Sequence, residues 1–90
     1  MRLVLCDDNR ILCEALASVL QARGHRVLAI ATQASEGVAA VCAHQPDACL
    51  LDVRLPDGSG IDAARAMHKL YPDAKIVMLS CLDEIGRAHV

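Results

Sequence analysis

Aromatic residues are almost absent from this chain of 90 residues. It has no Trp and no Phe, and Tyr71 is its only Tyr. Apolar residues nevertheless make up 54% of the chain, so we expect a core of aliphatic and sulfur-containing side chains. The same composition argues against a disordered chain, because disordered chains are poor in apolar residues. The length allows one domain and leaves no room for two.

Basic clusters and long apolar runs are also lacking. The nine Lys and Arg residues are scattered and the net charge is −2. This argues against nucleic-acid binding by this chain itself, because phosphate backbones are bound by basic surfaces. No apolar run approaches the roughly 20 residues that a membrane-spanning helix needs, and the N-terminus does not resemble a signal peptide. We therefore expect a cytoplasmic protein with no membrane partner.

No Cys-x-x-Cys pair occurs among the five cysteines. Their odd number and scattered positions argue against a zinc site and against a disulfide framework. We interpret them as small, buried and reduced hydrophobic residues of a cytosolic protein.

Apolar segments alternate with segments of helical periodicity along the chain. We expect strands at 3–6, 26–31, 48–51 and 75–79, and helices at about 11–20, 36–44 and 60–70. Strands that alternate with helices predict an α/β fold, an open parallel sheet with helices on both faces. The expected strand order is the flavodoxin-like 2-1-3-4.

The same patterns predict helix ends and inner faces. Asp8 or Asn9 can cap the first helix, Gly24 lies just past its end, and Ser59 with Asp62 resembles a capping box for the third. The side chains expected to face the core are Ile11, Leu12, Ala15, Leu16, Val19 and Leu20 in the first helix, Val38, Val41 and Cys42 in the second, and Ile61, Ala64 and Met67 or His68 in the third.

Carboxylates follow two of the predicted strands. Asp7 and Asp8 come directly after the first strand, and Asp52 ends the third. Binding sites of open α/β sheets form at the carboxyl ends of strands where the strand order reverses, so we expect these three side chains to converge. Close carboxylates repel one another, and a divalent cation removes this conflict. Because Mg²⁺ prefers hard oxygen ligands, the pattern predicts a magnesium site.

Asp52 is the better candidate nucleophile, because it stands alone whereas Asp7 and Asp8 form a pair suited to holding metal. A carboxylate beside a metal ion can accept a phosphoryl group and form an aspartyl phosphate. The hydroxyl of Ser80, at the end of the fourth strand, could bind a phosphoryl oxygen. Each residue alone also has a structural interpretation, as a helix cap, a loop carboxylate or a strand-end hydroxyl. Their conjunction at one sheet edge favours the chemical one.

These features resemble the receiver domain of bacterial two-component response regulators. The resemblance covers about residues 1–83 and is sharpest in residues 50–62, LLDVRLPDGSGID. It implies that Asp52 is the phosphoacceptor, that a sensor histidine kinase is the donor, and that Ser80 is the phosphate-sensing hydroxyl. It also implies that Mg²⁺ is held by Asp7, Asp8, Asp52 and the backbone carbonyl of Arg54. The implied role is phosphorelay signalling rather than enzymatic turnover, in a transcription regulator whose full-length parent could carry a helix-turn-helix DNA-binding domain.

The family's fifth strand, which ends in a lysine, and its fifth helix have no counterpart here. Neither Lys69 nor Lys75 is expected at the carboxyl end of a strand. We therefore expect a truncated receiver domain over residues 1–83, with an exposed fourth-strand edge that allows self-association. Residues 84–90 form no apolar face and contain Gly86, so we interpret them as a non-native tail.

Two alternatives remain open from the sequence. A Mg²⁺-dependent phosphatase that works through an aspartyl phosphate needs a second acid two residues after its nucleophile. Arg54 and Asn9 occupy those positions after Asp52 and Asp7, which argues against this class. The other alternative is an interaction fragment that keeps the fold but cannot switch, because the lysine is missing.

Overall fold

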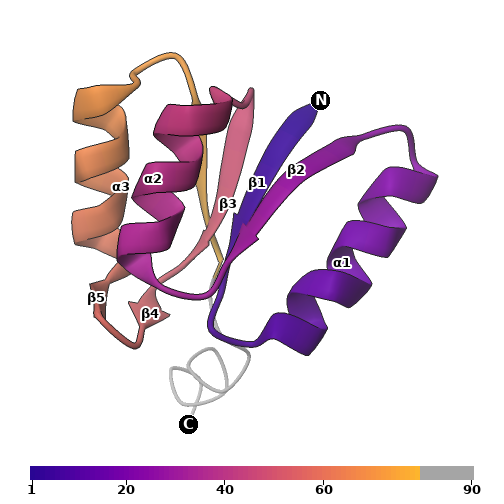
Figure 1. Ribbon diagram of the computed structural model, residues 1–90, viewed down its shortest axis with the longest axis horizontal. Coiled ribbons are helices and arrows are strands. Elements are labelled where there is room, and N and C mark those ends of the chain that lie inside the picture. Colours follow the sequence, from indigo (N-terminus) through magenta and orange to yellow (C-terminus); the bar gives the residue numbers. More distant parts are fainter. Residues whose placement is uncertain (80–90) are drawn as a thin grey trace, which may run out of the picture.

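The computed structural model of the protein describes residues 1–79, which form one parallel sheet with helices on both faces (Figure 1). The sheet strands are β1 (Arg2–Cys6), β2 (Arg26–Ala31), β3 (Ala48–Asp52) and β6 (Lys75–Leu79), and the helices are α1 (Arg10–Ala22), α2 (Ala34–His44) and α3 (Gly60–Leu70). Each lies within two residues of its expected bounds. None of the helices in residues 1–79 has the length and apolar character that crossing a membrane requires.

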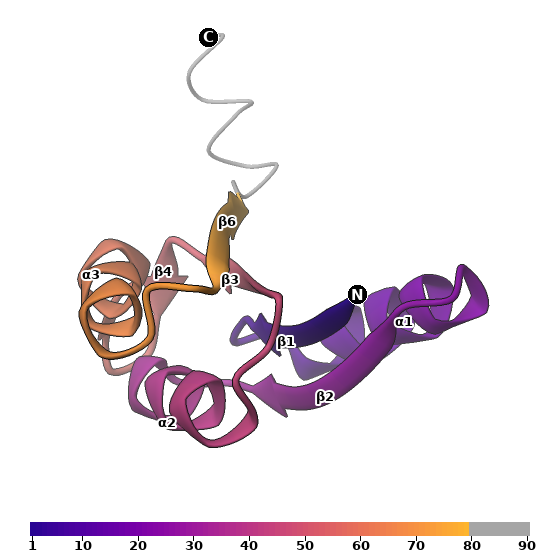
Figure 2. The same cartoon turned by 90° about the horizontal axis from the view of Figure 1, so that it is seen from above.

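The strand order is β2-β1-β3-β6, with every neighbouring pair parallel. This confirms the order 2-1-3-4 expected from the sequence, with β6 as the fourth strand. Because the order reverses between β1 and β3, their carboxyl ends lie side by side, with Cys6 paired to Leu51. Figure 2 shows α1 on one face of the sheet, and α2 and α3 together on the other.

The core divides into two apolar clusters, one on each face of the sheet. The larger lies under α2 and α3 and joins Val4, Cys6, Ala31, Val41, Cys49, Leu51, Leu55, Ala63, Met67 and Ala74. The smaller lies under α1 and consists of Leu5, Cys13 and Ala17 with partly buried neighbours. No polar or charged side chain is buried among the described residues. The expectation of an aliphatic, sulfur-containing core is confirmed.

The face that α1 presents to the sheet differs from the expected one. Cys13 and Ala17 are buried, whereas Ile11, Leu12 and Val19 are 81%, 51% and 52% exposed. The apolar stripe of α1 is wider than its contact with the sheet, and small side chains allow the closest approach. The predicted inner faces are also wrong at Cys42, which is exposed, and at Ile61, which is 49% exposed.

Helix ends follow the local chemistry of the chain. Asn9 caps α1, because its side chain accepts a hydrogen bond of 3.0 Å from the backbone N–H of Leu12. Gly24 follows α1 with a φ of +91°, a left-handed conformation that glycine adopts without strain. Ser59 caps α3 by accepting a bond of 3.1 Å from the N–H of Ile61.

A short antiparallel ribbon follows β3, where the sequence predicted only a turn. Its strands are β4 (Arg54–Leu55) and β5 (Gly58–Ser59), with Pro56 and Asp57 at the tip. Leu55 is buried in the larger cluster and anchors the ribbon on the α2 and α3 side. Residues 52–60 are therefore an ordered connection between β3 and α3.

Candidate functional site

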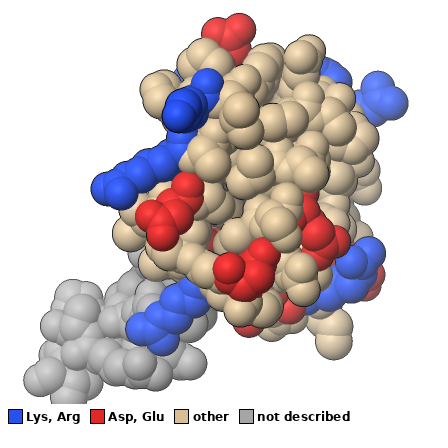
Figure 3. Space-filling view, turned by 60° about the vertical axis from the view of Figure 1, so that its left-hand side comes forward, with Lys and Arg blue, Asp and Glu red and all other residues tan. Residues whose placement is uncertain are grey.

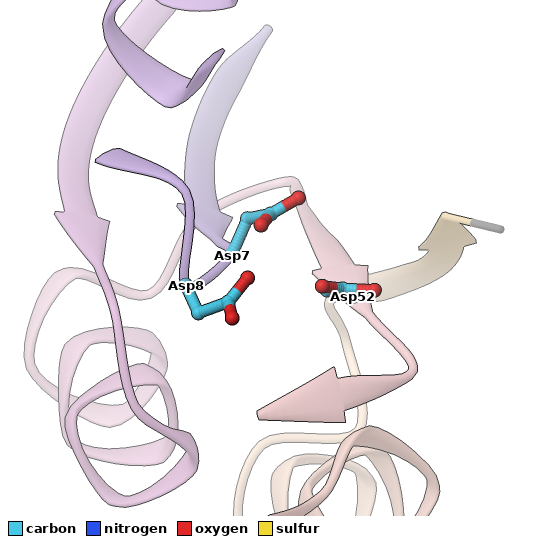
Figure 4. Close-up of side chains that lie close together, drawn as sticks. All are labelled: Asp7, Asp8 and Asp52. Carbon is cyan, nitrogen blue, oxygen red and sulfur yellow. The ribbon is translucent and has the colours of Figure 1, made fainter. Parts of the chain in front are cut away.

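Three carboxylates meet at the carboxyl edge of the sheet. Asp7 and Asp8 follow β1, and Asp52 is the last residue of β3. One oxygen from each lies within 4.8 Å of the others. Figure 4 shows the three side chains directed toward a common space. The cause is the strand register, because the pairing of Cys6 with Leu51 places the next residues of both strands side by side.

Backbone N–H groups of the turn after β1 donate two hydrogen bonds that fix its position. The N–H of Asp7 donates to the carbonyl of Ala31 at 3.0 Å, which extends the pairing of β1 with β2 by one residue. A carboxylate oxygen of Asp7 accepts from the N–H of Asn9 at 2.9 Å. Because Asn9 also caps α1, the start of that helix and the position of Asp7 are set together.

The electrostatics of the cluster favour a cation. Burial raises the pKa of Asp7, and the hydrogen bond from the N–H of Asn9 lowers it only in part. The negative charges of Asp52 and Asp8 raise the pKa of Asp7 further. A positive ion between these groups would remove the repulsion that the raised pKa reflects. Asp8 is exposed, so the cluster is open to solvent on that side.

The donor set fits a small divalent cation. Carboxylate oxygens are the hard ligands that Mg²⁺ prefers, at about 2.0–2.1 Å in an octahedron. Two oxygens on opposite sides of such an ion lie about 4.2 Å apart. At most one pair of three ligands can be opposite, and adjacent oxygens lie about 3.0 Å apart. The separation of at most 4.8 Å among Asp7, Asp8 and Asp52 therefore needs at most about 2 Å of closure. Small side-chain rotations supply a shift of this size.

The two ends of the connection between β3 and α3 lie in direct backbone contact. The N–H of Gly60 donates to the carbonyl of Val53 at 2.7 Å. A Cβ at Gly60 would overlap the carbonyl oxygen of Asp52, so only glycine fits at this close approach. The backbone of Asp52 is thereby held from both sides, by β3 and by the start of α3.

Arg54 and Ser80 are the two remaining predicted site residues. Arg54 is two residues after Asp52 and pairs with Ser59 across the ribbon. Leu79, the last residue of β6, pairs with Asp52 in the sheet. Ser80 follows Leu79 and lies outside the described residues, so its role stays a prediction.

Asp57 is a site neighbour that sequence reasoning took for an ordinary turn residue. Its carboxylate accepts hydrogen bonds from the N–H of Ala34 and from the N–H and hydroxyl of Ser35, at the start of α2. These bonds lower the pKa of Asp57. The partners are more than 20 residues away in the chain, and no local sequence pattern reports such a contact.

Several known proteins resemble this chain. RegA, the photosynthetic apparatus regulatory protein of Cereibacter sphaeroides, is 35% identical over 86 residues, which are 96% of this chain and 46% of RegA. The DNA-binding transcriptional activator DevR/DosR of Mycobacterium tuberculosis is 35% identical over 81 residues, 89% of this chain and 37% of that protein. The chain thus spans less than half of the length of these relatives.

Solved structures of response regulators have the same fold. A two-component response regulator of the LuxR family from Aurantimonas sp. superposes with a TM-score of 0.82 at 30% identity, over 88% of this chain and 57% of that one. The family described as the response regulator receiver domain matches residues 3–89. The sheet order, the carboxylate cluster and these similarities agree, and the chain belongs to the response regulator receiver domain family.

Proposed function

We propose that this receiver domain takes a phosphoryl group onto Asp52, with Mg²⁺ held by Asp7, Asp8, Asp52 and the backbone carbonyl of Arg54. The observation that carries the proposal is the convergence of three carboxylates at the carboxyl edge of a parallel sheet. Phosphoryl acceptance is general to the family to which the chain belongs. The cluster supplies both a carboxyl nucleophile and oxygen ligands for a metal.

The chemistry assigned to Asp52 is a phosphoryl transfer from a phosphohistidine. A carboxylate oxygen of Asp52 attacks the phosphorus, the phosphorus–nitrogen bond breaks, and its electron pair leaves on the imidazole nitrogen, which takes a proton from water. Bound Mg²⁺ would neutralise negative charge on the phosphoryl oxygens. Asp7 and Asp8 act as ligands beside the nucleophile, and Ser80 would donate its hydroxyl to a phosphoryl oxygen.

The proposed donor is a sensor histidine kinase in the cytoplasm. The relative DevR/DosR is a DNA-binding transcriptional activator, so we propose a DNA-binding segment for the full-length parent. Nucleic-acid binding by this chain itself is not expected. On the face shown in Figure 3, acidic side chains gather in the lower half, and Lys and Arg side chains lie toward the margins. This view shows no continuous basic surface of the kind that binds a phosphate backbone.

Self-association through β6 is a second proposed interaction. Among the described residues β6 is an edge strand of the sheet. Val77 and Met78 on this strand are 45% and 37% exposed. Exposed apolar edge strands pair with other chains. We expect the mass measured by sedimentation equilibrium to rise with concentration, and a constant monomer mass would contradict this proposal.

Mass spectrometry after treatment with acetyl phosphate and Mg²⁺ tests the phosphoacceptor proposal. We expect the intact chain to gain one phosphoryl group, and we expect Asp52→Asn to gain none. Asp47→Asn is the matched control, because Asp47 is an exposed carboxylate at the opposite edge of the sheet that accepts from the N–H of Arg2. It should be labelled like the unchanged protein.

Other outcomes would point to the alternatives. A folded chain that takes no label would support the interaction fragment that cannot switch. Release of phosphate from an added phosphate ester would support the aspartyl-phosphate phosphatase. Label retained in Asp52→Asn would place the acceptor elsewhere and contradict the assignment of Asp52.

A further inference from the structure

The carboxylate of Asp57 joins two parts of the fold that are distant in sequence. It lies at the tip of the β4–β5 ribbon, five residues after Asp52. One oxygen accepts from the N–H of Ala34 at 2.5 Å, and the other accepts from the N–H and the hydroxyl of Ser35 at 3.0 and 2.8 Å. Three hydrogen bonds therefore connect the loop of residues 52–60 to the start of α2.

Helix α2 needs this contact for its own start. The first N–H groups of a helix have no partner within it and are normally bound by a capping side chain. Gln33 occupies the capping position and makes no side-chain hydrogen bond there. Asp57 supplies the missing acceptor, and its negative charge suits the positive end of the helix dipole. At the other end, the guanidinium of Arg2 donates to the carbonyls of His44 and Gln45.

The segment of residues 31–35 lies between the two loops that carry the carboxylate cluster. On one side, the carbonyl of Ala31 accepts from the N–H of Asp7. On the other side, Ala34 and Ser35 donate to Asp57, in the loop that begins at Asp52. The segment that ends β2 and begins α2 is therefore hydrogen-bonded to both loops and connects them.

We propose that Asp57 is a positioning residue, which holds the loop of residues 52–60 against α2 and thereby sets the distance of Asp52 and the carbonyl of Arg54 from Asp7 and Asp8. This rests on the proposed Mg²⁺ site. Asp57 itself is not a ligand in this proposal. Its loss removes none of the three carboxylates, but it releases the loop that follows Asp52 from α2, so that Asp52 and Arg54 are held less firmly relative to the loop after β1. A metal site loses affinity when its ligands must first be brought together.

Mg²⁺ titrations of the full chain, followed by calorimetry, test this role. We expect Asp57→Ala to weaken Mg²⁺ binding about tenfold, the lower end of the range of about 10–100-fold seen when supporting contacts of metal ligands are removed. Asp57→Asn keeps one carbonyl oxygen as an acceptor, so its Mg²⁺ affinity should lie between those of the unchanged protein and Asp57→Ala. Asp47→Ala is the matched control, because it removes an exposed carboxylate that accepts from the backbone N–H of Arg2, at the opposite edge of the sheet.

A second measurement separates positioning from mere stabilisation. In the unchanged protein, Mg²⁺ should shift the amide resonances of Ala34 and Ser35, because they are bonded to the loop that carries the ligands. The shifts should be lost in Asp57→Ala. Ser35→Ala, which keeps both backbone bonds, should retain them and weaken Mg²⁺ binding by no more than about threefold, less than the supporting-contact range.

Each outcome decides between the proposals. If Asp57→Ala binds Mg²⁺ as the unchanged protein does, or if Asp47→Ala weakens binding equally, the positioning role is refuted. If the unchanged protein binds no Mg²⁺, the metal site fails, and the positioning role fails with it. Should Asp57→Ala not fold, the comparison of Asp57→Asn with Asp47→Asn decides, and equal affinities of these two would refute the role.

Discussion

Replacement of Gly60 by Ala tests the close approach of α3 to the end of β3. Gly60 is the first residue of α3 and is buried. A Cβ there would overlap the carbonyl oxygen of Asp52 and lie 2.9 Å from its carbonyl carbon and 3.0 Å from the Cα of Val53. All three neighbours are backbone atoms, so no flexible side chain can move aside. Either α3 or the backbone of Asp52 must shift.

Two effects of opposite sign decide how Gly60→Ala changes the free energy of unfolding. Helix propensity favours Ala over Gly by about 1 kcal/mol in a helix interior. Forcing an extra methyl group into a packed site costs about 1–3 kcal/mol, and backbone neighbours place this case at the upper end. We therefore expect Gly60→Ala to lower the free energy of unfolding by about 2 kcal/mol. Because the displaced atoms belong to Asp52, acceptance of a phosphoryl group should also slow.

Urea unfolding followed by far-ultraviolet circular dichroism measures the first effect, and the rate of labelling by acetyl phosphate measures the second. Gly24→Ala is the matched control. Gly24 has a φ of +91° and no atom within 4 Å of an added Cβ, so the replacement strains the backbone without a clash. It should cost about 1–2 kcal/mol and leave the labelling rate unchanged.

An increase in the free energy of unfolding of Gly60→Ala, of the size that helix propensity alone gives, would refute the close approach. Labelling of Gly60→Ala at the normal rate despite lower stability would show that α3 moves and the backbone of Asp52 does not. That second result would remove the link between this glycine and the site.

Three further changes test the cap, the core and a buried thiol. Asn9→Ala removes the acceptor for the N–H of Leu12 and should cost about 1 kcal/mol in urea unfolding, whereas an unchanged midpoint would contradict the cap. Met67→Ala empties a fully buried position between α2 and α3 and should cost about 2–5 kcal/mol, and a loss below 1 kcal/mol would contradict this packing. Burial raises the pKa of Cys49 from 9.0 to about 12, so the stability from its neutral thiol is complete below pH 9 and is lost as the pH rises from 9 to 12. At about pH 10.5 this loss amounts to about 2 kcal/mol. Between about pH 8 and pH 10.5 the free energy of unfolding of Cys49→Ala should therefore fall less than that of the unchanged protein.

General rules of parallel sheets made the fold and the carboxylate cluster predictable. Apolar segments without alternation indicated strands buried on both faces, and their alternation with helices fixed the parallel order. Once that order is known, the residues that follow β1 and β3 must be neighbours. The meeting of Asp7, Asp8 and Asp52 therefore follows from where each strand ends.

The details that the sequence did not reveal depend on contacts between distant residues. The apolar stripe of α1 does not say which side approaches the sheet, because Ile11 and Cys13 are both apolar and only packing selects the smaller. The β4–β5 ribbon is too short to show a periodicity. Asp57 meets Ala34 and Ser35 only after the chain has folded. Ser80 and the tail of residues 84–90 stay predictions, because they lie outside the described residues.

The uneven division of the core has a consequence for how the molecule opens. Helix α1 rests on a small cluster of Leu5, Cys13 and Ala17, whereas α2 and α3 share the larger one. Local unfolding begins where the fewest apolar contacts hold an element, so the amide hydrogens of α1 should exchange with deuterium before those of α2. When α1 detaches, Asn9 leaves with it, and Asp7 loses the hydrogen bond that orients its carboxylate. Retention of a bound ion would then depend on how often this helix opens.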